Sequence, residues 1–68
     1  MKITYYEKSD LLYIRLDDTM QQLVNKRVSD DVVLDLGTDD RIVGIEILGA
    51  SKRLSLDQLL PVEYERAR

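Results

Sequence analysis

Alternation of apolar and polar residues with a period of two is the feature that most constrains the fold of this chain. Side chains on a β-strand point to opposite faces in turn, so the pattern is typical of strands with one buried face. In one clear case Leu12, Ile14 and Leu16 share one face, and Tyr13 and Arg15 share the other. The segments that carry the pattern are residues 2–6, 11–16, 32–36 and 41–48. We therefore expect a sheet built from these four segments.

The segment between Met20 and Val28 is ambiguous between strand and helix. Val24 and Val28 fit one face of a strand, but Val24 also has helical spacing to Met20 and Arg27. We favour a polar edge strand, because Lys26 lies near its centre and sheet edges are commonly protected by lysine.

Short polar connections separate the expected strands and favour hairpins. Residues 7–10 and 37–40 each form a four-residue connection, and Gly37 in the second can adopt a positive φ. Gly44 lies inside the most apolar strand, where it marks a bulge, a bend or a close approach by another element. These connections predict an antiparallel meander of four to five strands.

The period changes after Gly49. Ser55, followed three residues later by Gln58, has the pattern of a helix N-cap with a capping box, and Pro61 ends the helix. Three apolar residues would lie on one face of this helix: Leu56, Leu59 and Leu60. Residues 50–54 are either an earlier helical turn or a loop.

The elements together predict a small α+β domain, with one short C-terminal helix packed on one face of the sheet. We divide the single domain into a β-meander (residues 1–48), a turn and helix (49–60) and a charged tail (61–68).

The composition excludes several classes of function. The 68 residues include no Cys and no His, which removes disulfides, the usual zinc ligands and the imidazole and thiol groups of most nucleophilic catalysis. The net charge of −3 argues against a dedicated nucleic-acid binder. No apolar run is long enough to span a membrane, and residues 1–4 do not resemble a signal peptide, so we expect a cytoplasmic protein. We also expect no cofactor.

Two motifs resemble those of a known family. The segment Asp10-Leu11-Leu12-Tyr13-Ile14-Arg15-Leu16 resembles a D-x-L-Y-I-x-L signature, and residues 41–51 resemble x-I-V-G-I-E-I-L-x-A-S. With the strand at residues 32–36 between them, the chain resembles the YuzE-like family of small uncharacterised prokaryotic proteins. Gly49 stands where this family pattern would have a polar residue.

The resemblance implies no activity, and so no catalytic residue is carried over. Some members are similar to partners in paired small-gene arrangements. The resemblance therefore suggests one half of a toxin–antitoxin-like pair.

Several carboxylates are candidates for chemistry. The pairs at residues 17–18, 30–31 and 39–40 could hold Mg²⁺ or Ca²⁺, but each lies where a turn is expected, and Asp is a common turn residue. Glu46 and Asp35 lie inside apolar strands, where a carboxylate needs a partner. We expect Glu46 to point outward and to pair with Arg15 or Arg41 across strands.

One short helix cannot cover both faces of a sheet of this size. We expect the uncovered face to carry a possible interaction surface, formed by five residues: Tyr5, Tyr13, Arg15, Ile42 and Glu46. A chain this short buries only about 60% of its unfolded surface, and association is a common way to supplement so small a core. We therefore expect a non-enzymatic protein-interaction domain that forms a homodimer or binds a second small protein.

The alternative is a small metal-dependent enzyme that uses carboxylates. Its candidate groups are Asp35, Glu46 and the paired turn residues, with no single catalytic or metal-binding residue assigned.

Overall fold

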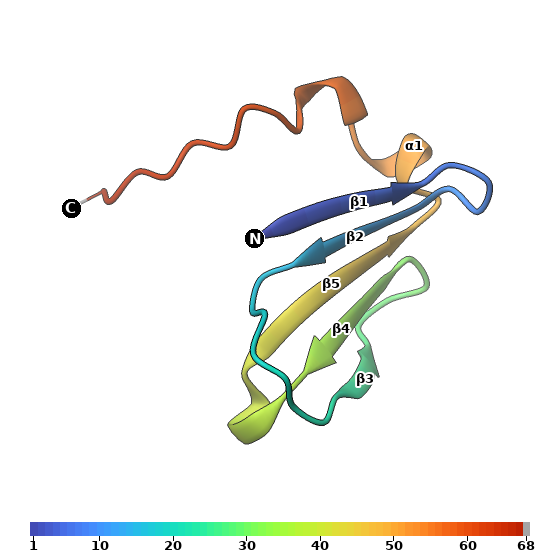
Figure 1. Cartoon of the computed structure of the whole chain (residues 1–68). Helices are drawn as coiled ribbons and strands as arrows, with labels where there is room; N and C mark the ends of the chain where they lie inside the picture. Colours follow the sequence, from blue (N-terminus) through green and yellow to red (C-terminus); the bar gives the residue numbers. More distant parts are fainter. Residues whose placement is uncertain (68) are drawn as a thin grey trace.

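Five strands form a single sheet in the computed structural model, which describes residues 1–67 (Figure 1). The strands, in chain order, are β1 Lys2–Tyr6, β2 Leu11–Arg15, β3 Val24–Arg27, β4 Val32–Leu36 and β5 Ile42–Leu48. The helical segments are the 3-10 turn η1 Thr38–Asp40, the helix α1 Ala50–Arg53 and the 3-10 turn η2 Leu56–Gln58. The predicted α+β class, with an antiparallel sheet and one short C-terminal helix, is confirmed. Within residues 1–67, none of the helices has the length and apolar character needed to cross a membrane.

The strand order differs in one respect from the simple meander that we expected. The order is β1-β2-β5-β4-β3, with every neighbouring pair antiparallel, so β2 pairs with β5 and not with β3. The hairpin β1–β2 and the meander β3–β4–β5 are joined by the connection at residues 16–23. The most apolar strand, β5, thereby becomes central, whereas the polar strand β3 lies at an edge.

The segment between Met20 and Val28 forms an edge strand, as favoured above. β3 spans only Val24–Arg27, and all four of its residues are exposed. Its polar composition suits an edge with an unpaired side, because charged side chains there discourage pairing with other chains.

Asp10 connects the β1–β2 turn to the start of α1. Asp10 has a φ of 53°, and its carbonyl oxygen accepts a hydrogen bond from Ala50 N at 2.9 Å. Its carboxylate accepts hydrogen bonds from Tyr5 Oη at 2.7 Å, Ser51 N at 2.9 Å and Ser51 Oγ at 2.7 Å. We call these four residues the Asp10 clasp. It fixes the direction in which the chain leaves the sheet after β5.

The helix position that we expected is wrong. The α-helix covers Ala50–Arg53, where the expectation was a helical turn or a loop. The segment after Ser55 forms only the 3-10 turn η2, and Ser55 makes no side-chain cap hydrogen bond. Gly49, with a φ of 61°, turns the chain directly off β5, so the Asp10 clasp starts the helix earlier than the local capping pattern suggested.

The connection at residues 37–40 also differs from expectation. Gly37 has a φ of −105°, and Asp39 and Asp40 adopt the positive φ values instead. A Cβ atom at Gly37 would lie 2.0 Å from Gln21 Oε1 and 2.9 Å from Val43 Cγ2, so a larger residue would require the Gln21 side chain to move. Gln21 Oε1 in turn accepts a hydrogen bond from Thr38 N at 2.8 Å. This contact attaches the connection between β2 and β3 to the end of β4.

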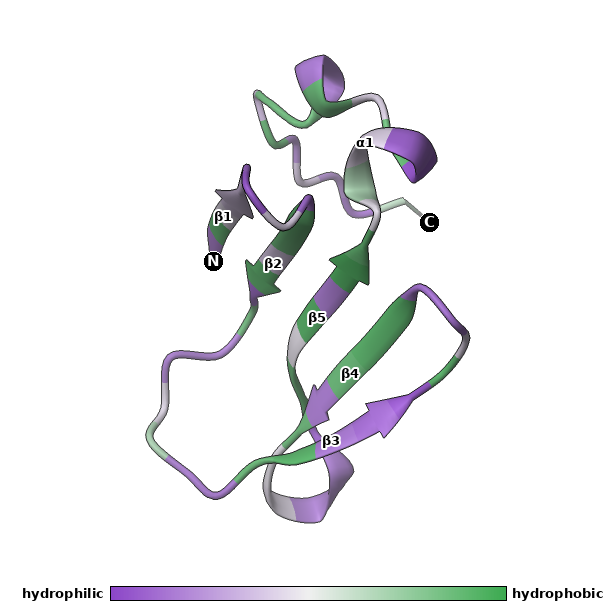
Figure 2. Cartoon of the chain, turned by 90° about the vertical axis from the view of Figure 1, so that its right-hand side faces the viewer, coloured by the Kyte–Doolittle hydropathy of each residue, from purple (hydrophilic) through white to green (hydrophobic). Residues whose placement is uncertain are grey.

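The fully formed core is small. Leu12, Val43 and Ala50 are completely buried, and Val33 is 9% exposed. Figure 2 shows α1 and η2 together at one end of the sheet, so the helical segments leave the rest of the sheet uncovered.

Candidate functional site

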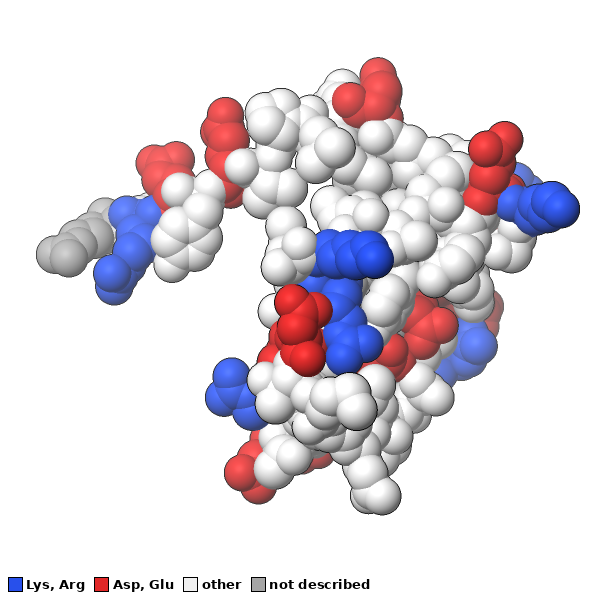
Figure 3. Space-filling model, in the orientation of Figure 1, with Lys and Arg blue, Asp and Glu red and all other residues white. Residues whose placement is uncertain are grey.

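Two adjacent cross-strand rows form the centre of one face of the sheet, which we call the polar face. The first row is Thr4, Tyr13, Glu46, Val33 and Arg27, from β1 to β3. The second row is Lys2, Arg15, Gly44, Asp35 and Asn25. Figure 3 shows basic and acidic side chains next to one another over the middle of the sheet. The polar face therefore gathers charged and hydrogen-bonding groups from all five strands.

Gly44 makes room for Tyr13 on the polar face. A Cβ atom at Gly44 would lie 2.3 Å from Tyr13 Oη and 2.7 Å from Tyr13 Cζ, so the tyrosine ring occupies the space where a side chain would be. Tyr13 thus leans from the first row toward Asp35 of β4, which pairs with Gly44 of β5 in the second row. Burial first, and then the Asp35 carboxylate, raise the pKa of Tyr13. Tyr13 therefore stays a neutral phenol.

Asp35 and Glu46 are the carboxylates at the centre of the polar face. Asp35 is only 6% exposed, and its Oδ1 accepts a hydrogen bond from Asn25 Nδ2 at 2.5 Å. Burial raises the pKa of Glu46, the neighbouring Asp35 raises it further, and the charge of Arg27 opposes the shift. Within residues 1–67, every buried side-chain nitrogen or oxygen atom has a hydrogen-bond partner. Asp35 is thus a buried carboxylate with a hydrogen-bond partner, and the charge of the neighbouring Glu46 is disfavoured.

A hollow of about 310 Å³ lies on the polar face toward β1. Its lining is mixed and comprises Lys2, Thr4, Tyr6, Tyr13, Arg15 and Asp18. Arg15 is partly engaged elsewhere, because its Nε donates a hydrogen bond to the carbonyl oxygen of Asp17 at 2.8 Å. The hollow could accept a small polar group, but it is shallow and open to solvent.

The residues that the structure describes contain no group of three Asp or Glu side chains placed to hold a metal ion. The pairs at 30–31 and 39–40 lie in turns, as expected, and the pair at 17–18 lies in the connection after β2. Asp17 Oδ1 accepts a hydrogen bond from Thr19 N at 2.9 Å, which lowers the pKa of Asp17.

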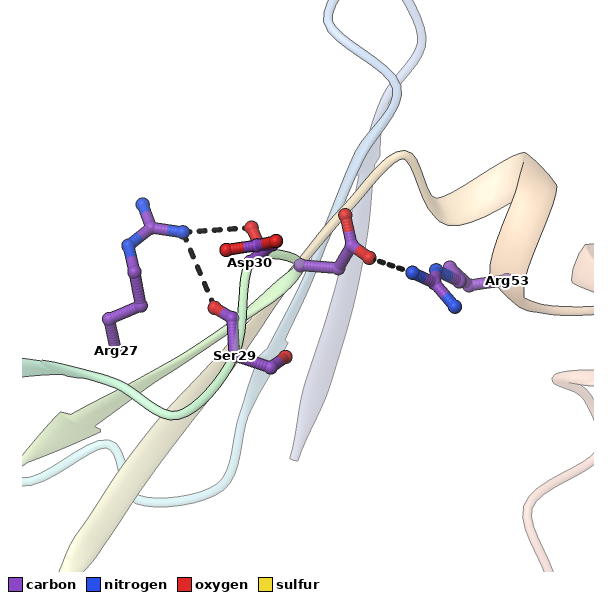
Figure 4. Close-up of polar contacts among 5 residues, drawn as sticks. Arg27, Ser29, Asp30 and Arg53 are labelled. Carbon is purple, nitrogen blue, oxygen red and sulfur yellow. Dashed lines mark hydrogen bonds and ion pairs between the residues drawn. The ribbon is translucent and has the colours of Figure 1, made fainter.

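Around the second pair, basic residues from two elements stabilise the turn between β3 and β4 (Figure 4). Arg27 Nη1 donates to the carbonyl oxygens of Ser29 at 3.4 Å and Asp30 at 2.8 Å. Arg53 of α1 forms an ion pair with Asp31. These carboxyl and carbonyl groups are therefore used in holding the turn.

The opposite side of the sheet, which we call the apolar face, carries two hollows. The first has a volume of about 330 Å³ and lies between the β1–β2 hairpin and η2. Its lining, which we call the groove, is Ile3, Tyr5, Leu12, Leu56, Asp57, Leu59 and Leu60. The second, of about 340 Å³, is lined by Val32, Ile47, Leu54 and polar residues at the start of β4 and the end of α1. Ile14, Leu34 and Ile45 also alternate onto this face, and they are only half-buried.

The five residues of the expected interaction surface do not lie together. Tyr13, Arg15 and Glu46 are neighbours on the polar face. Tyr5 pairs with Leu12 and lines the groove, so our placement of Tyr5 beside Tyr13 is wrong. Ile42 is 48% exposed and pairs with Leu36 beyond a register shift, outside both rows.

The expected cross-strand partner of Glu46 is also corrected. Arg15 stands opposite Gly44 and not opposite Glu46, and Arg27 is the basic residue whose charge acts on Glu46. Sequence reasoning missed Asn25 and Arg27 as members of the polar face. Their alternation in β3 was readable, but their positions beside Asp35 and Glu46 depend on the register between strands.

Comparison with known families gives one match. A family model described as a protein of unknown function (DUF2283) matches residues 2–51, which is more than half of the chain. The matched range contains all five strands, both rows of the polar face and the whole Asp10 clasp. No curated protein and no solved structure matches the chain.

Proposed function

Since the chain belongs to the DUF2283 family, the YuzE-like family that its motifs resemble and whose function is unknown, we propose a function from its surface. The protein is a non-enzymatic interaction domain that associates with a second copy of itself. The apolar face forms the contact.

The observation that carries this proposal is the area that a single chain leaves exposed. Its solvent-accessible surface is 5780 Å². A compact monomer with a mass of 7.9 kDa exposes about 4,400 Å². The excess of about 1,400 Å² includes the exposed residues 61–67 as well as the uncovered sheet, and it is larger than the roughly 800 Å² that each partner contributes to a standard stable interface.

The shape and the core support the same proposal. The radius of gyration is 12.9 Å, whereas a compact domain of 68 residues has a value of about 11 Å. Among residues 1–67, four apolar side chains are buried, which is a small core for a domain with five strands. A second copy placed over the half-buried Ile14, Leu34 and Ile45 would remove apolar area from water and enlarge this core.

Molar mass in solution tests the proposal. Size-exclusion chromatography with light scattering, run from low to high micromolar protein, should give the mass of two chains and a transition to one chain on dilution. A mass of one chain at the highest concentration would overturn self-association.

A further inference from the structure

The segment at residues 61–67, which we call the arm, extends away from the sheet (Figure 1). Every arm residue is exposed, and two of its apolar side chains are Val62 at 52% and Tyr64 at 87%. Glu63 and Glu65 alternate with these two apolar residues, and Leu60, just before the arm, is 71% exposed. An extended segment with period-two alternation has one apolar side, and this arm leaves that side in water.

Resting on the proposed self-association, we infer that the arm of one copy binds in the groove of a second copy, with Tyr64 as the anchor. By two-fold symmetry the exchange is reciprocal, so a dimer contains two identical arm–groove contacts.

The groove has the chemistry to accept a tyrosine. Six of its seven lining residues are apolar or aromatic, and its volume is about 330 Å³. A tyrosine buries about 150–250 Å² and usually finds a hydrogen-bond partner for its hydroxyl group when it is buried. Asp57 in the lining supplies a carboxylate that can accept this bond.

A second copy suits the geometry better than the same chain does. Leu60 lies in the groove lining, and Tyr64 lies four residues further along an extended segment, about 13 Å away. The arm would therefore have to reverse its direction to enter its own groove. Extended toward a neighbour, its seven residues span about 23 Å, which is comparable with the shortest dimension of the molecule, 21 Å.

Substitution of the anchor is the first test. Tyr64→Ala should raise the dimer dissociation constant about tenfold or more, as expected for the loss of a central aromatic anchor. A chain that stops at Leu60 should remain folded and be monomeric. The matched control is Tyr6→Ala, which removes another exposed tyrosine, on the polar-face side of β1, and should leave the dissociation constant unchanged.

Cross-linking is the second test, because the natural chain has no cysteine. Glu65→Cys and Gln58→Cys place single thiols beside the anchor and beside the groove without altering either. An equimolar mixture of the two variants, oxidised under mild conditions, should give a two-chain product that contains one of each. A mixture of Glu65→Cys with Lys26→Cys, on the far edge of the sheet, should give little of that product.

The outcomes separate this inference from the proposed function. If dimers persist unchanged in Tyr64→Ala and in the shortened chain, self-association stands and the role of the arm is overturned. If the natural chain is monomeric throughout, both are overturned. If the shortened chain and Tyr64→Ala lower the unfolding midpoint of a protein that is always monomeric, the arm binds its own chain and the exchange is excluded.

Discussion

At the residue scale, Tyr13 and Gly44 depend on one another. The tyrosine ring lies over the glycine because no side chain occupies that space, and this position carries the hydroxyl group toward Asp35. Both residues belong to the motifs that carry the family resemblance. Those motifs therefore have a packing reason that does not require catalysis.

Gly44→Ala should destabilise the fold by about 1–3 kcal/mol, because the new methyl group would overlap the Tyr13 ring. The measurement is the free energy of unfolding in urea. In a Tyr13→Leu background the same substitution should cost less, since the overlapping ring is gone. An equal cost in both backgrounds would show that the two residues are not coupled.

Asp10→Asn should destabilise the protein at neutral pH. Hydrogen bonds from Tyr5 and Ser51 hold the pKa of Asp10 below its ordinary value of 3.8. A carboxyl group whose pKa is lower in the folded than in the unfolded chain stabilises the fold at pH values above the unfolded pKa. This contribution is lost as the pH falls through the folded pKa. The variant should therefore have a lower urea midpoint at neutral pH, and the difference should vanish well below pH 3.8.

Asparagine tolerates the positive φ of Asp10, so the substitution tests the carboxylate and not the backbone. Asp39→Asn is the control, because Asp39 has a similar φ of 56° and lies outside the Asp10 clasp. A loss for Asp10→Asn that did not vary with pH would contradict the electrostatic explanation.

Glu46→Gln should have the opposite effect at neutral pH. Burial, followed by the neighbouring Asp35, raises the pKa of Glu46 above its ordinary value of 4.5. The folded chain then binds the proton more tightly than the unfolded chain, so stability is fully present below pH 4.5 and is lost as the pH rises through the folded pKa. The glutamine variant should be more stable than the natural chain at neutral pH, with a smaller difference in acid. A less stable variant at neutral pH would show that attraction to Arg27 outweighs burial.

At the scale of elements, the helical segments differ from the strands in how far local sequence predicts them. Four of the strands follow from alternation within five to seven residues and formed where the pattern indicated, whereas β3 lies in the segment that was ambiguous between strand and helix. The helix α1 instead depends on Asp10, which is 41 residues away from Ser51 along the chain. The capping pattern at Ser55 is local and complete, yet it produces only a 3-10 turn. A motif read from neighbouring residues does not reveal a cap supplied by another element.

Two serine substitutions compare these signals. Ser51→Ala removes a hydrogen bond to Asp10 Oδ2 and should lower the unfolding midpoint clearly. Ser55→Ala removes no side-chain cap bond and should change the free energy of unfolding by less than about 0.5 kcal/mol. Thermal unfolding of both variants, followed by circular dichroism, provides the measurement. Equal losses would mean that Ser55 does cap a helix in solution.

At the scale of the whole molecule, the sequence predicted the hairpins but not their assembly. Short connections indicate which consecutive strands pair, whereas the pairing of β2 with β5 spans residues 16–41, which include β3 and β4, and depends on burying β5. The prediction of the polar face from the sequence was limited in the same way. Tyr13, Arg15 and Glu46 were expected together, but Asn25 and Arg27 join them only once the register of β3 and β4 is known.

If the fold is completed by a second copy, stability must depend on protein concentration. A dimer that unfolds to two separate chains becomes more stable as the protein concentration rises. Each tenfold rise in concentration increases its apparent free energy of unfolding by about 1.4 kcal per mole of dimer. The thermal midpoint of the natural chain should therefore rise with concentration across the micromolar range. Tyr64→Ala should show this rise only at concentrations about tenfold higher or more, and Tyr6→Ala should behave like the natural chain. A midpoint that is constant for the natural chain would mean that the small core, with Leu12 and Val43 at its centre, is stable without a partner.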